Sequence, residues 1–228
     1  MAGPACAGCR RAWSLVVIAA VLLPGLSRAV AADAESRDFN ITVDGKAAGD
    51  YHMTISRPDD GSVSMTARSD VHVKVVLVTV YRYTYQGVEV WKDGRLQHLA
   101  CSGKENGKAF AVTAEPAGDG LHVVANGQEH VSRPDVWTTS CWQLPSAKFR
   151  NQDVPLLGCD NGRDIAGHLQ LVGNEVIHVA GQDQACAHWR LTNGVPHDLW
   201  YDAQERMVRH EWVTDGHRTV LEMVGLRR

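Results

Sequence analysis

The stretch that decides the fold runs from Ser62 to Val112 and reads SVSMTARSDVHVKVVLVTVYRYTYQGVEVWKDGRLQHLACSGKENGKAFAV. Apolar and aromatic residues recur in it at every second position, on the parity of Val63, Val71 and Tyr85. Because successive side chains of a β-strand point to opposite faces, this pattern predicts strands with one apolar face. Between positions 75 and 80 both parities are apolar, which predicts cover on both faces, and Gly87 is expected to introduce a bulge.

Turn signals separate these strands along the whole chain. Asp-Gly or Asn-Gly occurs nine times, at positions 44, 60, 93, 106, 119, 126, 161, 193 and 215. These dipeptides supply the positive φ values that tight hairpin turns require. The turn at 93–94 places Trp91 opposite Leu96 and Glu89 opposite His98, and the turn at 106–107 places Glu105 opposite Lys108.

The spacing of these turns predicts an all-β protein with local connections rather than a βαβ fold. We expect a single curved antiparallel meander, a half-barrel or barrel-like sheet, that forms one domain over residues 32–228. Residues 145–154 lack alternation and begin with Pro145, which predicts one short helix or an irregular crossover there. Residues 33–37 read as a short polar lead.

The first 31 residues have the features of a signal peptide. Arg10 and Arg11 form a basic region, Leu15 to Leu23 are nine consecutive apolar residues, and Ala29-Val30-Ala31 fits a cleavage site. Nine residues are too few to cross a hydrocarbon core of about 30 Å as a helix. We therefore predict cleavage after Ala31 or Ala32, export to the periplasm or the extracellular space, and no transmembrane segment in the mature chain.

Charge and composition restrict the partners. The predicted leader carries three arginines, which leaves 20 of the 23 basic residues against all 26 acidic ones in the mature chain. An acidic balance argues against nucleic acid and anionic membranes, which bind basic surfaces. No cofactor is expected, and the sequence does not identify a protein partner.

Four cysteines follow the predicted leader: Cys101, Cys141, Cys159 and Cys186. An oxidising compartment allows them to pair, and four cysteines allow three connectivities. The short separation makes Cys141–Cys159 the first candidate for a disulfide, with free buried thiols as the alternative.

Several short patterns, taken together, resemble an uncharacterised family of exported bacterial proteins, a domain of unknown function. They are Tyr83-x-Tyr85, Glu89-Val90-Trp91, Asp93-Gly94-Arg95-Leu96, Thr139-Ser140-Cys141-Trp142 and Leu199-Trp200-Tyr201-Asp202. The resemblance covers most of residues 38–225 and implies export and a β-rich fold, but no activity. The chain departs from it at Cys141, where an aromatic residue is expected. A looser, architectural likeness is to the periplasmic lipoprotein-carrier superfamily of open half-barrels, and fold does not determine function.

The sequence contains no strong catalytic or metal motif. Ser140 lacks the strand–turn–helix elbow of a serine hydrolase. The histidines are scattered along the sequence, and the Cys186-x-His188 pattern supplies only two possible ligands. A metal site needs three or four converging ligands. Another candidate is a polar cluster of Glu89, Arg95, Arg209 and Asp202 beside tryptophans, the composition of a small-ligand cleft.

We hypothesise that the protein is not an enzyme but binds or carries an apolar small molecule or lipid on the concave face of its sheet. The predicted lining residues are Val73, Val75, Leu77, Tyr81, Tyr83, Tyr85, Trp91, Leu96, Trp142 and Trp200. The first alternative is a non-enzymatic envelope interaction or scaffold protein with a filled core. The second is a hydrolase or a metal-binding protein.

Overall fold

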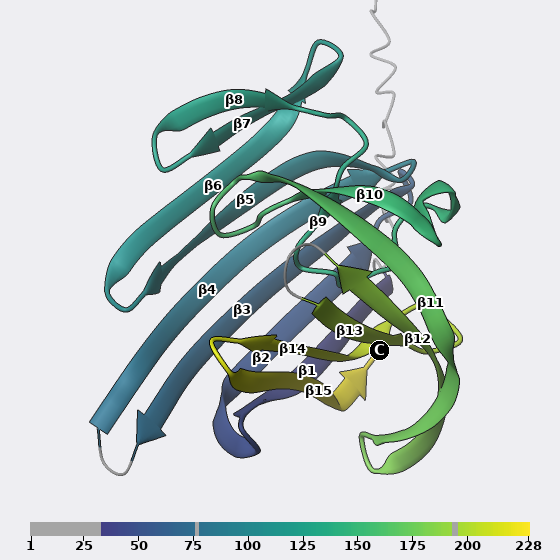
Figure 1. Cartoon of the computed structure of the whole chain (residues 1–228). Helices are drawn as coiled ribbons and strands as arrows, with labels where there is room; N and C mark the ends of the chain where they lie inside the picture. The colour runs from purple at the N-terminus through teal and green to yellow at the C-terminus, as the bar shows by residue number, and fades with distance from the viewer. Residues whose placement is uncertain (1–32, 76–77, 193–195) are drawn as a thin grey trace, which may run out of the picture. The chain divides into compact units, whose positions relative to one another are not determined.

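The computed structural model describes residues 33–75, 78–192 and 196–228, and within these ranges it contains fifteen β-strands and one short 3-10 helix (Figure 1). The first half comprises β1 (Asp33–Val43), β2 (Lys46–Arg57), β3 (Ser62–Val75), β4 (Val78–Lys92), β5 (Arg95–Glu105), β6 (Lys108–Ala117), β7 (Gly120–Ala125) and β8 (Gln128–Ser132). The second half comprises β9 (Trp137–Thr138), the helix η1 (Ala147–Phe149), β10 (Gln152–Leu157), β11 (Asp164–Val179), β12 (Gln182–Thr192), β13 (Pro196–Tyr201), β14 (Met207–Thr214) and β15 (His217–Arg227).

All fifteen strands form a single sheet in the order β8-β7-β6-β5-β4-β3-β2-β1-β15-β14-β13-β12-β11-β10-β9. Each half is therefore a meander of neighbouring hairpins, and the two halves join where β1 pairs with β15. The pairings are antiparallel except that of β9 with β10. These two strands are parallel, because an irregular crossover through η1 connects them. The predicted curved all-β meander, with its short helix or crossover near 145–154, is confirmed.

The sheet bends back on itself so that its two halves share one core. β11 runs through a long arc in Figure 1, and the turn that follows it donates a hydrogen bond from Ala180 N to Met223 O of β15. Side chains from both halves belong to one buried cluster, among them Ile55 and Leu99 from the first and Leu156 and Tyr201 from the second. Apolar burial of this kind is the main favourable term in folding.

The hairpin turns have the predicted chemistry. Both residues of the turns at 44–45, 93–94, 106–107, 126–127 and 215–216 have positive φ. The pairs Trp91–Leu96 and Glu105–Lys108 are confirmed. The predicted pair of Glu89 with His98 is wrong, because a register shift between Val90 and Trp91 places Glu89 opposite Leu99.

The bulge expected at Gly87 is also absent. Gly87 pairs regularly with Ala67 on one side and Cys101 on the other, and it occupies an inward-facing position. A Cβ atom there would overlap the Tyr85 hydroxyl and lie 3.1 Å from the Cys101 Sγ. Glycine is therefore required by the close approach of these side chains rather than by a change of phase.

Residues 33–37 are not a polar lead but the first part of β1, paired with both β2 and β15. Glu35 and Arg37 are buried there. No helix in the described ranges is both long and apolar enough for a membrane span. The predicted leader lies outside the described residues.

Candidate functional site

A single buried carboxylate organises one end of the core. Glu89, on β4, has no exposed surface. Its Oε2 accepts hydrogen bonds from the indole nitrogens of Trp91 at 2.8 Å and Trp142 at 3.0 Å, and from Thr138 Oγ1 at 3.0 Å. Thr138 Oγ1 also lies 2.9 Å from the Ser140 hydroxyl, which itself hydrogen-bonds Glu89. Three of these four donors, Thr138, Ser140 and Trp142, thus tie the segment after β8 to the middle of the sheet, whereas Trp91 lies on β4 itself.

No basic side chain contributes to this set of contacts. Burial raises the pKa of the Glu89 carboxyl above its ordinary value, and the hydrogen bonds from Ser140, Trp91, Thr138 and Trp142 offset part of that rise. Removing a carboxylate from water disfavours its charged form, while donors favour it. Glu89 is therefore a buried acid held by neutral donors. Two of the sequence patterns noted above, Glu89-Val90-Trp91 and Thr139-Ser140-Cys141-Trp142, meet at this point.

One thiol lies close to this carboxylate, since Cys159 Sγ is 3.8 Å from Glu89 Oε1. Another buried thiol, that of Cys101, lies 3.1 Å from the Tyr85 hydroxyl. The hydrogen bond with Cys101, together with burial, raises the pKa of the Cys159 thiol. A thiol with a raised pKa stays in its neutral and weakly nucleophilic form.

The four cysteines 101, 141, 159 and 186 are free thiols, so the predicted Cys141–Cys159 disulfide is not formed. Cys141 has a positive φ of 52°, and its Sγ lies 3.8 Å from the Thr138 carbonyl of its own turn. This local contact engages the Cys141 thiol within its own turn, whereas the Cys159 thiol lies beside Glu89 of β4.

A half-enclosed cleft of about 420 Å³ lies beside the Glu89 site. Trp91 is common to both, because its side chain lines the cleft and its nitrogen binds Glu89. The turn at 93–94 and Arg95 form one side of the cleft, and residues 135–137 and 143–150 form the other. Trp91 and Trp137 are buried, and Leu144 and Phe149 are half-buried apolar walls.

The charges around the cleft are mostly paired. Lys148 contacts Asp135 at 2.8 Å, and Arg150 binds Glu205 at 2.6 Å. Arg95 is exposed and has no carboxylate partner within the described ranges. The cleft therefore combines apolar walls with one available guanidinium, and the exposed carboxylate of Asp93 lies in the same turn.

A second, larger hollow of about 840 Å³ lies on the other face of β1–β6 and is more open. Its lining mixes short polar side chains such as Ser36 and Thr54 with small apolar ones such as Ala100 and Ala111. Among its charged residues, Asp38 already contacts His52 at 2.6 Å and Arg227 at 2.6 Å. It is a broad trough on the solvent side of the sheet.

The structure separates the predicted lining residues into two groups. Tyr85, Trp91, Leu96, Trp142 and Trp200 are buried, so they form part of the filled core. Val73, Tyr81 and Tyr83 are half-buried and pack against it. Val75 lies in β3 with its side chain undescribed, and Leu77 is outside the described residues.

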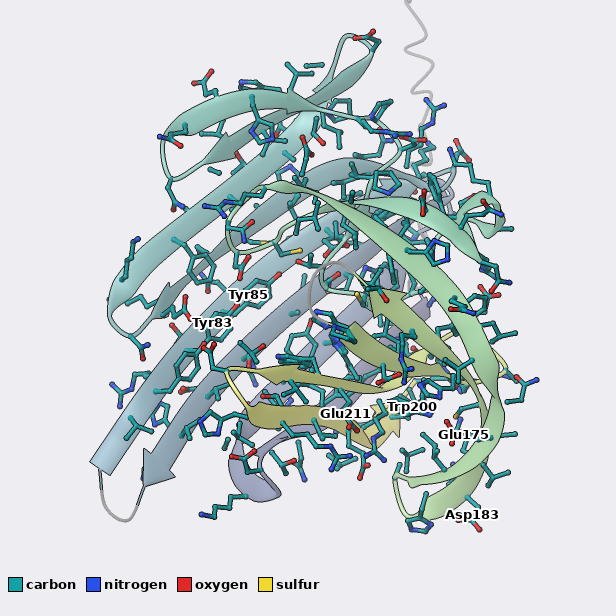
Figure 2. The ribbon with its side chains drawn as sticks, viewed as in Figure 1. Tyr83, Tyr85, Glu175, Asp183, Trp200 and Glu211 are labelled. Carbon is teal, nitrogen blue, oxygen red and sulfur yellow. The ribbon has the colours of Figure 1, made fainter. Side chains whose placement is uncertain are left out.

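Aromatic rings continue from the core to these half-buried positions. Figure 2 shows Tyr83 and Tyr85 as neighbours on β4, and their rings are stacked with centroids 6.4 Å apart. Phe110 of β6 stacks on Tyr83 at 5.9 Å. Burial raises the pKa of Tyr83, so its phenol is neutral across the physiological range. These rings pack against one another, and they line neither of the two hollows described above.

The predicted polar cluster of Glu89, Arg95, Arg209 and Asp202 is not assembled. Arg209 lies over the Trp200 ring, 5.2 Å from its centroid, and contacts Glu211 and Glu222. Figure 2 shows Trp200 and Glu175 together, and the Trp200 indole donates to Glu175 Oε1 at 2.6 Å. Glu89 and Arg95 share only the neighbour Trp91, whose indole binds Glu89 and whose side chain lines the cleft together with Arg95.

Asp202 belongs instead to a buried ionic network that sequence reasoning missed. Arg206 contacts Asp202 at 2.6 Å and Glu35 at 3.5 Å. Arg37 donates to Glu35 at 2.7 Å and to the Trp142 carbonyl at 3.0 Å. The only available signal was the shared parity of Glu35 and Arg37. The network joins β1, the β13–β14 turn and the segment that holds Glu89.

The histidines do not form a metal site in the part of the chain described here, where no group of three or more His, Cys, Asp or Glu side chains converges. His197 and His210 form a pair, with Nδ1 and Nε2 2.9 Å apart, beside Trp212. Burial lowers the pKa of both imidazoles.

The fold and the site together define an all-β, barrel-like domain with a filled core and a cleft beside a buried acid. A model of the family described as Domain of unknown function (DUF6134) matches residues 39–224, and the chain belongs to this family. No curated protein matches the chain.

One solved structure shows the same architecture. It is the crystal structure of a beta-barrel-like protein of domain of unknown function DUF1849 from Brucella abortus. The similarity has a TM-score of 0.59 and 8% sequence identity, and it covers 85% of this chain and 96% of that one. At this identity the likeness concerns the fold alone.

Proposed function

We propose that this protein is an exported binding protein for a small amphipathic molecule, one with an apolar body and an acidic group, that occupies the cleft beside Trp91. The observation that best supports this proposal is the cleft itself. It has buried tryptophans, apolar walls and one guanidinium that has no carboxylate partner among the described residues. Its volume of about 420 Å³ falls in the range of roughly 300–1,000 Å³ that is usual for small-molecule sites. Acyl chains with a carboxylate head belong to this class of ligand.

Two features favour the cleft, rather than the concave face of the sheet, as the binding site. The interior rings that would line a hollow, such as Trp142 and Trp200, are in the core. The cleft, in contrast, is a real opening whose walls Leu144 and Phe149 remain half-exposed. Export is supported by the basic, apolar and small-residue pattern of the first 31 residues.

The test is titration of the mature protein with a dansyl-labelled long-chain fatty acid, followed by displacement with the unlabelled acid. We expect saturable binding that Arg95→Gln weakens by roughly 10- to 100-fold, since a hydrogen bond to a charged group contributes roughly 1.5–3 kcal/mol. Arg82→Gln is the matched control, because Arg82 is exposed and does not line the cleft. Equal affinities for the Arg95 and Arg82 variants would contradict the proposed head-group site.

A second pair of variants tests the apolar wall. Phe149→Ala should weaken binding, and Phe110→Ala, which removes a half-buried ring outside the cleft, should leave it unchanged. If Tyr83→Ala and Phe110→Ala weaken binding while Phe149→Ala does not, the ligand lies on the concave face that the sequence predicted. If no fatty acid binds, the filled-core interaction or scaffold protein is the better account.

A further inference from the structure

The trough on the solvent side of β1–β6 is lined by side chains that form a row across the strands. The register places one polar side chain of each strand directly opposite the next, in the order Asp38, His52, Arg68, Gln86 and Ser102. We call these residues the charged row. All of them line the trough and are half-buried or exposed, so their polar groups are open to a ligand.

A second row runs beside the first, two residues away along each strand. It consists of small side chains from β1 to β6, in the order Ser36, Thr54, Thr66, Val88, Ala100 and Thr113. We call it the short row, and all its members also line the trough. Small side chains next to longer ones leave a hollow, whose volume is about 840 Å³.

The spacing of the two rows restricts what fits the hollow. Neighbouring strands lie about 4.8 Å apart, so each row presents one side chain at each such interval, over about 24 Å from β1 to β6. An extended peptide advances by about 3.3 Å per residue and therefore does not match this interval. A linear chain of sugar rings has a repeat close to it, so successive rings can lie over successive strands.

The chemistry of the rows fits a hydroxyl-rich chain. The hydroxyl groups of serine and threonine and the amide of Gln86 both donate and accept hydrogen bonds, as sugar hydroxyls do. Gln86 Nε2 already donates to Ser102 Oγ at 3.1 Å, which orients both groups along the charged row. Val88 and Ala100 offer small apolar surfaces for the C–H faces of the rings.

The charges of the trough favour an acidic ligand. Asp38 is already neutralised, because His52 Nδ1 and an Arg227 nitrogen each lie 2.6 Å from its carboxylate. Arg68 is exposed in the middle of the charged row and has no carboxylate partner within the described ranges. A guanidinium in this position can bind a carboxylate through two parallel hydrogen bonds.

We propose that the trough is a second binding site, which takes a linear oligosaccharide that carries carboxylate groups. The chain lies across β1 to β6, with its rings over the short row and one carboxylate at Arg68. The site is independent of the cleft beside Trp91, because no residue lines both hollows. Failure of fatty-acid binding at the cleft therefore leaves this proposal intact.

The experiment is calorimetric titration of the mature protein with linear oligomers of galacturonic acid of increasing length. We expect the affinity to rise with length and to level off once the chain spans the trough, at about 24 Å. Arg68→Gln should weaken the binding by about tenfold, the effect of losing one charge-assisted hydrogen bond. Arg82→Gln is the matched control, since Arg82 is exposed outside the trough. Xylohexaose, a neutral linear oligomer, should bind more weakly and be insensitive to Arg68→Gln.

A second variant tests the short row. Thr54→Tyr places a ring in the hollow and should abolish binding, whereas Thr192→Tyr, the same exchange at an exposed position of β12, should retain it. Tyrosine is favoured in strands, so both variants should keep the urea midpoint of the wild type. The proposal is overturned if no oligomer binds, if affinity is independent of chain length, or if Arg68→Gln binds like the wild type. Equally tight binding of poly-glutamate would overturn the assignment to a saccharide.

Discussion

Replacing Glu89 by glutamine should change how the stability of this protein depends on pH. Glu89 is fully buried, and burial raises its pKa in the folded state. The folded protein therefore holds this proton to a higher pH than the unfolded chain does. The stabilisation from this proton is complete below the unfolded pKa near 4.5, and it is lost as the pH rises through the folded pKa.

The size of the effect follows from linkage. Within that window, the free energy of unfolding should fall by about 1.4 kcal/mol per pH unit relative to a variant without the ionisable group. Glu89→Gln keeps an acceptor for the donors and cannot ionise, so its profile lacks this fall. Glu89→Ala leaves the indoles of Trp91 and Trp142 without an acceptor, whereas the Thr138 hydroxyl keeps its contact with Ser140. At roughly 1–3 kcal/mol for each of the two unsatisfied indoles, a loss of about 2–6 kcal/mol is expected.

The assay is urea unfolding of the wild-type protein and the Glu89→Gln variant between pH 4.5 and pH 8, monitored by tryptophan fluorescence. Glu105→Gln is the control, because Glu105 is exposed at the end of β5 and its neutralisation removes no buried charge. Parallel stability profiles for the wild-type protein and Glu89→Gln would refute the assignment of Glu89 as a buried acid with a raised pKa.

Two further predictions concern close contacts in the core. Arg37→Met should lower the free energy of unfolding by about 3–5 kcal/mol, because it leaves buried Glu35 without its nearest cation; a urea midpoint like that of the wild type would contradict this role. Gly87→Ala should cost about 1–3 kcal/mol, since its methyl group overlaps the Tyr85 hydroxyl. Gly173→Ala, where nothing lies within 4 Å of the added atom, should leave the melting temperature nearly unchanged, and similar losses in both glycine variants would argue against overpacking at Gly87.

The sequence pointed to several residues of the candidate site but did not predict which of them come together. The patterns around Glu89, Trp91 and Trp142 were identified as a set, yet Glu89 was grouped with Arg209 and Asp202 rather than with Thr138. The true partners are 49 residues away for Thr138 and 53 for Trp142. No local periodicity specifies which distant donors will meet a buried carboxylate.

The disulfide prediction failed for a related reason. Cys141 and Cys159 are close in sequence, and sequence distance was the only criterion available. Cys141 has a positive φ and its thiol contacts the Thr138 carbonyl of its own turn, whereas the Cys159 thiol lies beside Glu89. The cleft was missed as well, because its two sides come from the β4–β5 turn and from residues 135–150.

The sequence by itself determined the strands, the hairpin turns and the inward parity of residues such as Met65, Tyr85 and Trp91, because alternation and positive-φ turns are local properties. It could not determine the pairing of β1 with β15, the inward position of Arg37, or the approach of the two halves of the sheet. Those features depend on how apolar faces far apart in the chain fit together, and only the tertiary structure brings such faces into contact. The cleft and the hydrogen bonds of the buried acid both depend on such long-range contacts.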